Sequence, residues 1–398
     1  MTLSGARQVG AQRIALITTT AIAVVSDAVL VPFYPQLFES AFGVDEPSHV
    51  GIYLAATCLT VMFMLPLWAE LGRRIPTLAL LAVAQAGAGT LSLVCFASTD
   101  LAQFWIISLT MIVFKASYLL VYPYLMRLTD ETNHVQTIGL LTVIVHLGAI
   151  LGAVIGGWIL SVSSPRHGFI AMAIGDFAQM AVCMYLLARG ARGPQDSSED
   201  SGRFMESLRD GRWVQVAKLA SVMFALYLSA FVLRPFFVQY WTMRSLSDSE
   251  LIAGLVFSIP AWMSLACLFY QRRNPTPPPI LRSFALCTLG LLLQCVPSVP
   301  LLVLGLALFG WSLFRAMVHL DALIFETSPP ELYATAFSQM HFFQQLGALV
   351  GFYVAGSAVA QHGLVAPFAV AAGGFVVTAV LFHRFFTRAP VAEEAVAT

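Results

Sequence analysis

The sequence has few charged residues. Lys, Arg, Asp and Glu make up 11% of its 398 residues, whereas soluble domains carry about 25%. Hydrophobic residues make up 58%, which is more apolar surface than a water-soluble fold can bury. The scarcity of charge therefore excludes an ordinary soluble protein. The formal net charge is zero, so bulk charge gives no indication of a nucleic-acid partner, and we expect none.

Several motifs that carry chemistry are also missing. The six cysteines all fall in apolar runs and include no Cys-x-x-Cys pair, so neither a disulfide framework nor a zinc site is indicated. The sequence contains no Gly-x-x-x-x-Gly-Lys-Ser/Thr loop for a nucleotide phosphate and no His-Glu-x-x-His metal motif. We therefore expect no cofactor, no metal site and no enzymatic activity.

Long apolar runs are what the sequence has in abundance. Each is long enough to cross a hydrocarbon core of about 30 Å as a helix. Cutting the runs at Pro, Gly and charged residues predicts twelve transmembrane helices and an all-α, polytopic membrane protein. The predicted helices lie near residues 14–37, 48–69, 75–97, 101–126, 136–161, 168–189, 215–241, 249–270, 281–297, 300–325, 334–360 and 366–386.

The arginines of the predicted loops fall almost entirely on one side of the membrane. If both termini are cytoplasmic, the outer loops contain only Arg166 and Arg244, and the other loop and tail arginines are on the inner side. This distribution follows the positive-inside rule. We expect a multi-pass protein of the cell membrane, most simply a bacterial plasma membrane, with cytoplasmic N- and C-termini.

The two halves of the chain repeat one another in unbroken order. Matched segments include SDAVLVPFYPQ with SAFVLRPFFVQ, RRIPT with RRNPT, and LGAILGAVIGG with LGALVGFYVAG, which begin at residues 26 and 229, 73 and 272, and 147 and 346. The sequence thus predicts two pseudo-symmetric six-helix bundles, residues 1–190 and 213–398, joined by a polar cytoplasmic linker at 191–212. Repeated bundles of this kind place a substrate site between them near the midplane.

Three motifs carry a family resemblance. GAILGAVIGG, from Gly148 to Gly157, is similar to the G-x-x-x-G-P-x-x-G-G motif of proton-linked exporters in the major facilitator superfamily, with Ala153 where the family has proline. Its glycines would form a flat face against which a neighbouring helix can rock. Ordinary small-residue packing is an equally good interpretation. The glycines of this expected conformational element are Gly148, Gly152, Gly156 and Gly157.

The other two motifs are partial matches. Lys115 stands where the family has an arginine in its fourth helix, and Arg315 is the counterpart in the tenth. PLWAELGRRIPT resembles the loop motif after the second helix, which implies a conformational latch formed by Glu70, Arg73 and Arg74. Membrane topology alone would also explain the two arginines. The resemblance covers essentially the whole chain.

Six ionisable residues lie well inside the predicted helices. A charge there costs about 2.5 to 3.5 kcal/mol on insertion scales, so each residue is a functional hypothesis by default. Three acids and three bases balance, so pairing across the bundle is the alternative. The resemblance implies that helices 1, 4, 7 and 10 line a central cavity, and all but one of the six lie on these helices. They are Asp27, Lys115, Arg234, Arg315 and Asp321, with Asp176 on helix 6 outside the set.

Helical spacing separates the residues of the tenth helix. Arg315 and His319 share one face, whereas Asp321 lies about 240° round the helix from Arg315. Asp321 is therefore expected to pack against a neighbouring helix instead of lining the cavity. We expect proton coupling through Asp27, placed near midplane. His319 is a second candidate because an imidazole ordinarily titrates near pH 6.5, and a purely structural role is an equally good interpretation of this histidine.

The residues expected to bind substrate combine charges with aromatic rings. The charges counted on the cavity helices leave a surplus of one positive charge, which favours an organic anion or zwitterion over a lipophilic cation. The expected substrate-binding residues are Asp27, Lys115, Tyr118, Tyr122, Arg234, Phe236, Arg315 and His319. The sequence leaves open whether Asp27 and Lys115 touch.

The resemblance implies a secondary transporter that works by alternating access. We expect a monomer in the lipid bilayer that exports a small metabolite, siderophore or antibiotic-like compound in exchange for protons. Uptake of an organic anion or siderophore with protons is the alternative. A transporter-like receptor and a membrane enzyme rank below both, because the longest polar segment is the short linker and no catalytic constellation is present.

Overall fold

The computed structural model describes residues 3–121, 124–125, 134–190, 213–245, 249–273, 279–326 and 333–387. Within these ranges every regular element is helical. The elements of the first half are α1 (Leu3–Ala28), η1 (Val31–Phe33), α2 (Tyr34–Phe42), α3 (Pro47–Arg74), α4 (Thr77–Ala97), α5 (Leu101–Lys115), η2 (Ala116–Leu120), α7 (His134–Val162) and α8 (His167–Ala188). Those of the second half are α10 (Trp213–Phe231), α11 (Phe237–Ser245), α12 (Glu250–Phe257), α13 (Ile259–Arg273), α14 (Ile280–Cys295), α15 (Val299–Glu326), α16 (Tyr333–His362), α17 (Ala366–Phe382) and η5 (His383–Thr387).

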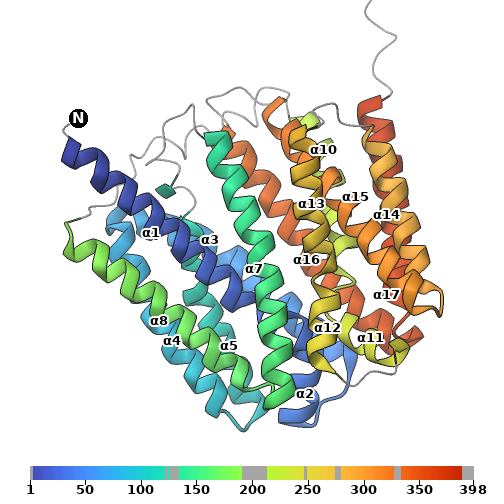
Figure 1. The fold of residues 1–398 in the computed structure, drawn as a ribbon, viewed down its shortest axis with the longest axis horizontal. Coiled ribbons are helices and arrows are strands. Elements are labelled where there is room, and N and C mark those ends of the chain that lie inside the picture. Colours follow the sequence, from blue (N-terminus) through green and yellow to red (C-terminus); the bar gives the residue numbers. More distant parts are fainter. Residues whose placement is uncertain are drawn as a thin grey trace, which may run out of the picture.

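The predicted fold class is confirmed. Eleven helical segments of the described chain are long and apolar enough to cross a membrane, and α14 is a shorter apolar helix. Together they account for the twelve predicted spans. Figure 1 shows that α1 begins, and α17 with η5 ends, at the same end of the bundle, its upper edge in that view. Residues 191–212 of the predicted linker lie outside the described residues.

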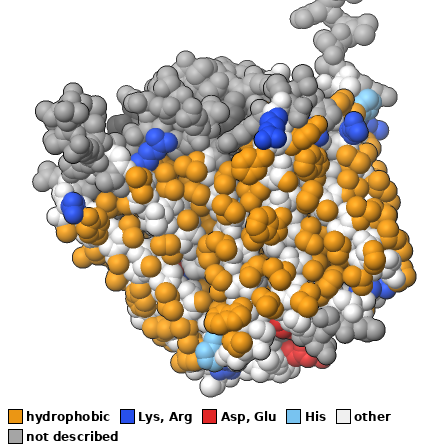
Figure 2. All heavy atoms as spheres, in the orientation of Figure 1, with side chains coloured by type: hydrophobic (Ala, Val, Ile, Leu, Met, Phe, Trp, Pro, Cys, Tyr) orange, Lys and Arg blue, Asp and Glu red, His pale blue; other side chains and the backbone are white. Residues whose placement is uncertain are grey.

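The outer surface is apolar, the reverse of a soluble protein. Phe63, Val83 and Ile106 are each more than two-thirds exposed. Figure 2 shows hydrophobic side chains across the middle of the face in view, with charged side chains near its edges. Such a continuous apolar band is what a lipid-facing surface requires.

Proline interrupts the first helix of each half at the same place. α1 ends at Ala28, and the chain passes through η1, which contains Pro32, into α2. In the second half α10 ends at Phe231, and Pro235 lies in the turn before α11. Proline lacks a backbone N–H and clashes with the preceding turn, so an α-helix cannot continue through it unbroken. The shared Pro-Phe of the repeated segments thus produces a matched helix break.

Small residues bring helices together within each half in matching ways. A Cβ at Gly148 of α7 would lie 2.7 Å from Val24 of α1, and one at Gly152 would lie 2.5 Å from Ala28. In the second half Gly347 of α16 faces Phe224 of α10 in the same manner. The glycine row of helix 5 therefore packs mainly against α1 of its own bundle.

Glycines also form the seam between the halves. A Cβ at Gly51 of α3 would lie 2.7 Å from the carbonyl oxygen of Phe352 in α16. A Cβ at Gly254 of α12 would lie 2.5 Å from the carbonyl oxygen of Ala153 in α7, so any side chain would separate these backbones. Both crossings lie towards the end of the bundle that carries α2, α11 and α12, opposite the chain ends (Figure 1). The two halves are thus closed against each other at that end.

We predict that Gly254→Leu opens this seam, because the added side chain has no room beside Ala153. Spin labels at the exposed Glu46 and Gln361, at the same end of α3 and α16, should move apart in a pulsed electron resonance experiment. The matched control is Gly373→Leu, since a Cβ at Gly373 meets nothing within 4 Å. An unchanged distance in Gly254→Leu would mean that this contact does not hold the halves together.

Candidate functional site

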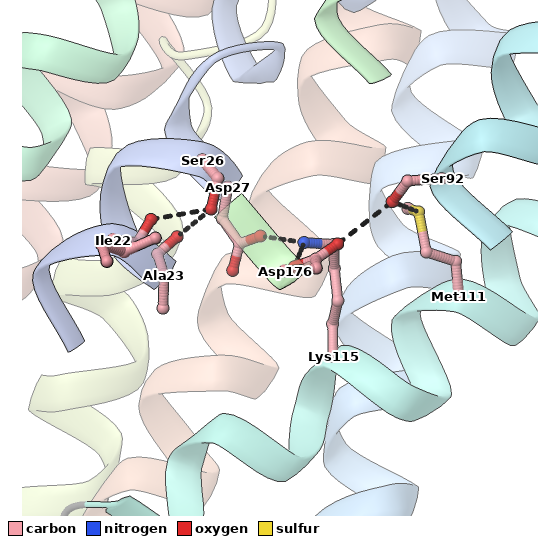
Figure 3. A network of polar contacts seen from close by, with 8 residues as sticks. All are labelled: Ile22, Ala23, Ser26, Asp27, Ser92, Met111, Lys115 and Asp176. Carbon is pink, nitrogen blue, oxygen red and sulfur yellow. Dashed lines mark hydrogen bonds and ion pairs between the residues drawn. The ribbon is translucent and has the colours of Figure 1, made fainter. Parts of the chain in front are cut away.

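Lys115 forms the centre of a charged cluster inside the first half. Its Nζ lies 2.8 Å from Oδ1 of Asp27 and 2.7 Å from Oδ1 of Asp176 (Figure 3). The three residues come from α5, α1 and α8. Lys115 is the last residue of α5 before the chain tightens into η2, so its charge also faces the negative end of the α5 dipole. We call these three residues the charge triad.

The two carboxylates of the triad differ in exposure. The side chain of Asp176 is 1% exposed and that of Lys115 is 6% exposed, whereas that of Asp27 is 34% exposed. Asp176 is also fixed by Ser92 of α4, whose hydroxyl donates to Oδ2 at 3.2 Å. A buried charge is tolerated only when it is paired and hydrogen-bonded. Asp176 and Lys115 meet that condition without Asp27, which leaves Asp27 as the accessible member.

Asp176 has a partner that the sequence analysis did not assign to it. It lies on helix 6, outside the four helices expected to line the cavity, and its Oδ1 is 2.7 Å from Nζ of Lys115. The available signal was the charge balance, which predicts pairing of acids and bases inside a membrane. The contact between Asp27 and Lys115, which the sequence left open, is present.

The second half has the same scaffold without the acids. Gly175 of α8 faces Ser26 of α1, and Gly374 of α17 faces Ser229 of α10 in the same way. The positions that directly follow these residues can therefore be compared between the halves. Asp27 follows Ser26 and corresponds to Ala230, and Asp176 follows Gly175 and corresponds to Phe375. Ala230 and Phe375 are both buried, and Arg315 is the base that corresponds to Lys115. Among the residues that the structure describes, the triad belongs to the first half alone.

Arg234 lies in the helix break of the second half. It is exposed although the residues on either side of it are buried. Its guanidinium lies 4.0 Å from the ring centre of Phe231 in α10. It also interacts electrostatically with Tyr227 of α10 and with Cys58 of α3, which belongs to the other half. Arg234 is therefore between the bundles, and within the described ranges it has no carboxylate partner.

The charged residues of α15 diverge as their spacing predicts. Asp321 is half-buried within hydrogen-bonding reach of Gln344 on α16 and interacts electrostatically with Tyr227 of α10. Arg315 is half-buried and interacts with Cys267 of α13. The His319 ring is 6.3 Å from that of Phe382 in α17. Asp321 thus faces α10 and α16, while Arg315 and His319 face the opposite side of α15.

The remaining expected site residues that the structure describes lie in several different elements. Tyr118 is half-buried in η2, and Phe236 is 2% exposed within an apolar cluster that includes Val29, the residue after α1. Glu70 and Arg74 form an exposed salt bridge of 2.9 Å along α3. Of the glycines of helix 5, Gly156 faces Phe33 of η1 and Gly157 faces Glu250 of α12 across the seam. Tyr122 and the side chain of Arg73 lie outside the described residues.

Comparison with known proteins identifies the class. The family model described as Major Facilitator Superfamily matches residues 16–272. The chain therefore belongs to the major facilitator superfamily, a family of transporters. A search of curated proteins gave no match.

Solved structures share the fold at low sequence identity. A D-xylose-proton symporter has a TM-score of 0.76 at 12% identity, over 94% of this chain and 97% of that one. The human organic anion transporter MFSD10 (TETRAN) has a TM-score of 0.70 at 17% identity, over 94% and 99%. The nucleoside transporter NupG has a TM-score of 0.68 at 15% identity, over 94% and 98%. At these identities the likeness establishes the fold alone.

We predict that Lys115→Met destabilises the protein by about 3 kcal/mol or more, because it leaves Asp176 as a buried carboxylate without its base. The double variant Lys115→Met/Asp176→Asn should recover part of the loss in apparent melting temperature. Glu70→Gln, in the exposed salt bridge, is the control and should cost about 0.5 kcal/mol or less. A double variant no more stable than Lys115→Met would show that Asp176 does not depend on Lys115.

Proposed function

We propose that the protein is a secondary transporter that moves a small organic anion or zwitterion by alternating access, coupled to protons through Asp27. The observation that carries this proposal is the charge triad. Lys115 is already neutralised by the buried Asp176, so the half-exposed Asp27 is a second acid on the same base. Asp27 can therefore gain or lose a proton while Lys115 stays paired with Asp176.

Charge arithmetic links the protonation of Asp27 to conformational change. With both acids ionised, the triad has a net charge of −1, and one proton on Asp27 makes it neutral. An uncompensated charge in a dry membrane interior is costly. Closing the cavity around the triad therefore favours the protonated form, and opening it to water favours release. His319 lies against Phe382, on the side of α15 that faces away from α10. No acid–base cluster like the charge triad surrounds His319 among the described residues, so we assign coupling to Asp27.

Arg234 supports an anionic or zwitterionic substrate. The surplus positive charge inferred from the sequence disappears once Asp176 is included, because the six intramembrane charges then balance. What remains is one exposed guanidinium between the halves, stacked on Phe231 and without a carboxylate partner in the described part of the chain. Such a group suits a carboxylate or phosphate, which arginine binds with two parallel hydrogen bonds.

The two halves are the moving units of this proposal. We propose that residues 1–190 and 213–398 rock about the glycine seam of α3, α7, α12 and α16, connected by residues 191–212, in a monomer. With both termini in the cytoplasm of a bacterial cell, the closed seam would lie on the outer side. Asp27 lies next to the end of α1 and Arg234 lies in the break between α10 and α11, which supports this proposal because transporter sites are commonly formed at broken helices.

We predict that Asp27→Asn abolishes transport driven by a pH gradient but keeps substrate exchange at equal pH, because asparagine fills the same space without titrating. A ligand screen by thermal shift first identifies a transported anion or zwitterion. Proteoliposomes with a pH-sensitive dye then report proton movement. Glu39→Gln, an exposed acid on α2, is the control. Proton movement at the wild-type rate in Asp27→Asn would remove Asp27 from the mechanism.

Export is the direction we propose, on the resemblance of helix 5 to the exporter motif. Uptake of an organic anion or siderophore with protons is the second candidate. It is retained because the glycine contacts recur in the second half, where Gly347 and Gly351 of α16 face α10 much as Gly148 and Gly152 face α1. A feature shared by both halves belongs to the scaffold and does not by itself indicate direction.

Growth of a deletion strain distinguishes the two directions. An exporter predicts that loss of the protein raises sensitivity to the substrate and its intracellular level, because outward flux stops. An importer predicts the reverse, with lower accumulation and resistance to a toxic analogue. Complementation with wild type but not with Asp27→Asn is the matched control. Reduced accumulation in the deletion strain would refute export.

A further inference from the structure

A groove of about 550 Å³ runs between α14 and α17 in the second half. The two helices pack against each other, and each contributes a row of side chains to the groove. On α14 the row extends from Leu281 to Thr288, and on α17 and η5 it extends from Val376 to His383. Residues seven positions apart lie on one face of a helix. Each row therefore covers two helical turns, about 10 Å along the axis.

The groove opens to the lipid-facing surface of the bundle. Val376 and Val380 in its wall are 50% and 46% exposed, and Leu289, the residue after Thr288, is also exposed. Thr288 donates its hydroxyl hydrogen to the carbonyl oxygen of Phe284 at 3.0 Å, so this hydroxyl needs no partner from a ligand. The body of the groove thus presents apolar surface to hydrocarbon, which suits an acyl chain.

One end of the groove is basic. It is lined there by His383 and Arg384 of η5. Arg384 is exposed and forms no salt bridge within the described ranges, and Nδ1 of His383 is buried without a hydrogen-bond partner among the same residues. Arg282, next to the lining residue Leu281, is a further exposed base at the start of α14. No carboxylate is among the described residues that line the groove, so this end attracts an anion.

The groove has the orientation of a phospholipid in one leaflet. η5 ends at the edge of the bundle where α1 begins, the upper edge in Figure 1, and Figure 2 shows histidine and basic side chains along that edge above the apolar face. With both termini in the cytoplasm, as proposed above, the basic end lies at the cytoplasmic interface and the apolar body extends towards the middle of the bilayer. A phospholipid of the cytoplasmic leaflet places its phosphate and its acyl chains in the same order.

We propose that this groove binds an anionic glycerophospholipid, with one acyl chain between α14 and α17 and its phosphate on Arg384. Arginine binds a phosphate with two parallel hydrogen bonds, and a phosphate or ester oxygen supplies the partner that Nδ1 of His383 lacks. A zwitterionic headgroup would bring its own ammonium group close to Arg384 and Arg282, so an anionic headgroup is favoured. The site is separate from the charge triad and does not depend on the identity of the transported substrate.

Two lipids with the same chains test the headgroup preference. They are palmitoyl-oleoyl phosphatidylglycerol, which is anionic, and palmitoyl-oleoyl phosphatidylcholine, which is zwitterionic. Each is titrated into the purified full-length protein in detergent, and native mass spectrometry counts the bound lipids. We expect the first phosphatidylglycerol to bind at least about fivefold more tightly than phosphatidylcholine, which is the factor expected from one basic side chain beside an anionic lipid.

Matched variants then locate the bound lipid. Arg384→Gln should reduce phosphatidylglycerol affinity about fivefold and leave phosphatidylcholine unaffected. Its control is Arg189→Gln, an exposed arginine at the end of α8 in the other half. Val380→Trp should lower the affinity for both lipids because the larger side chain covers the groove. Its control is Val377→Trp, at an exposed residue of α17 that does not line the groove.

Three results would overturn the assignment. Equal affinity of the wild type for the two lipids would show that the basic end does not select an anionic headgroup. Loss of lipid to the same extent in Val380→Trp and Val377→Trp would show that the groove is not the binding site. A dimer that dissociates only in Val380→Trp, with no change in bound lipid, would show that a second copy of the chain covers this groove.

Discussion

The buried ion pair between Lys115 and Asp176 is the interaction on which the rest of the first half depends. Neither charge could remain in an apolar bundle alone, and their 2.7 Å contact joins α5 to α8. Because Ser92 of α4 completes the coordination of Asp176, three helices are fixed around one point. Asp27 of α1 is then the only member of the triad whose protonation can change while the pair stays intact. Asp176 therefore anchors Lys115 structurally, whereas Asp27, the second carboxylate on the same lysine, is the group we propose to exchange protons.

Duplication explains why the halves can differ in chemistry and still share a fold. The contacts of Gly175 with Ser26 and of Gly374 with Ser229 fix the same helix packing in both bundles. With packing determined by small residues, the next position along each helix is free to vary. The first half uses these positions for Asp27 and Asp176, and the second fills them with Ala230 and Phe375. A symmetric scaffold thus supports an asymmetric distribution of charge.

The sequence predicts the helices well and their contacts less well. Spans and breaks follow from local features, such as apolar length and the prolines at 32 and 235, which act within one helix. The contact of Asp176 with Lys115 depends on how α8 is rotated about its axis, and a helix that is apolar on all sides gives little indication of that rotation. The same reason explains why Phe236, expected in the site, is packed in an apolar cluster. For α15 the spacing was informative, because charges at 315, 319 and 321 define two faces.

The short length of α14 has a consequence for the surrounding lipid. Its 16 residues span about 24 Å, less than the roughly 30 Å of a typical hydrocarbon core. Neighbouring α15 has 28 residues, so the hydrophobic height of the protein changes abruptly around its perimeter. A span this short is accommodated by local thinning of the lipid or by flanking side chains that reach the interface. The bilayer is therefore a mechanical partner of the second half, and any movement that tilts α14 changes the elastic energy stored in the membrane.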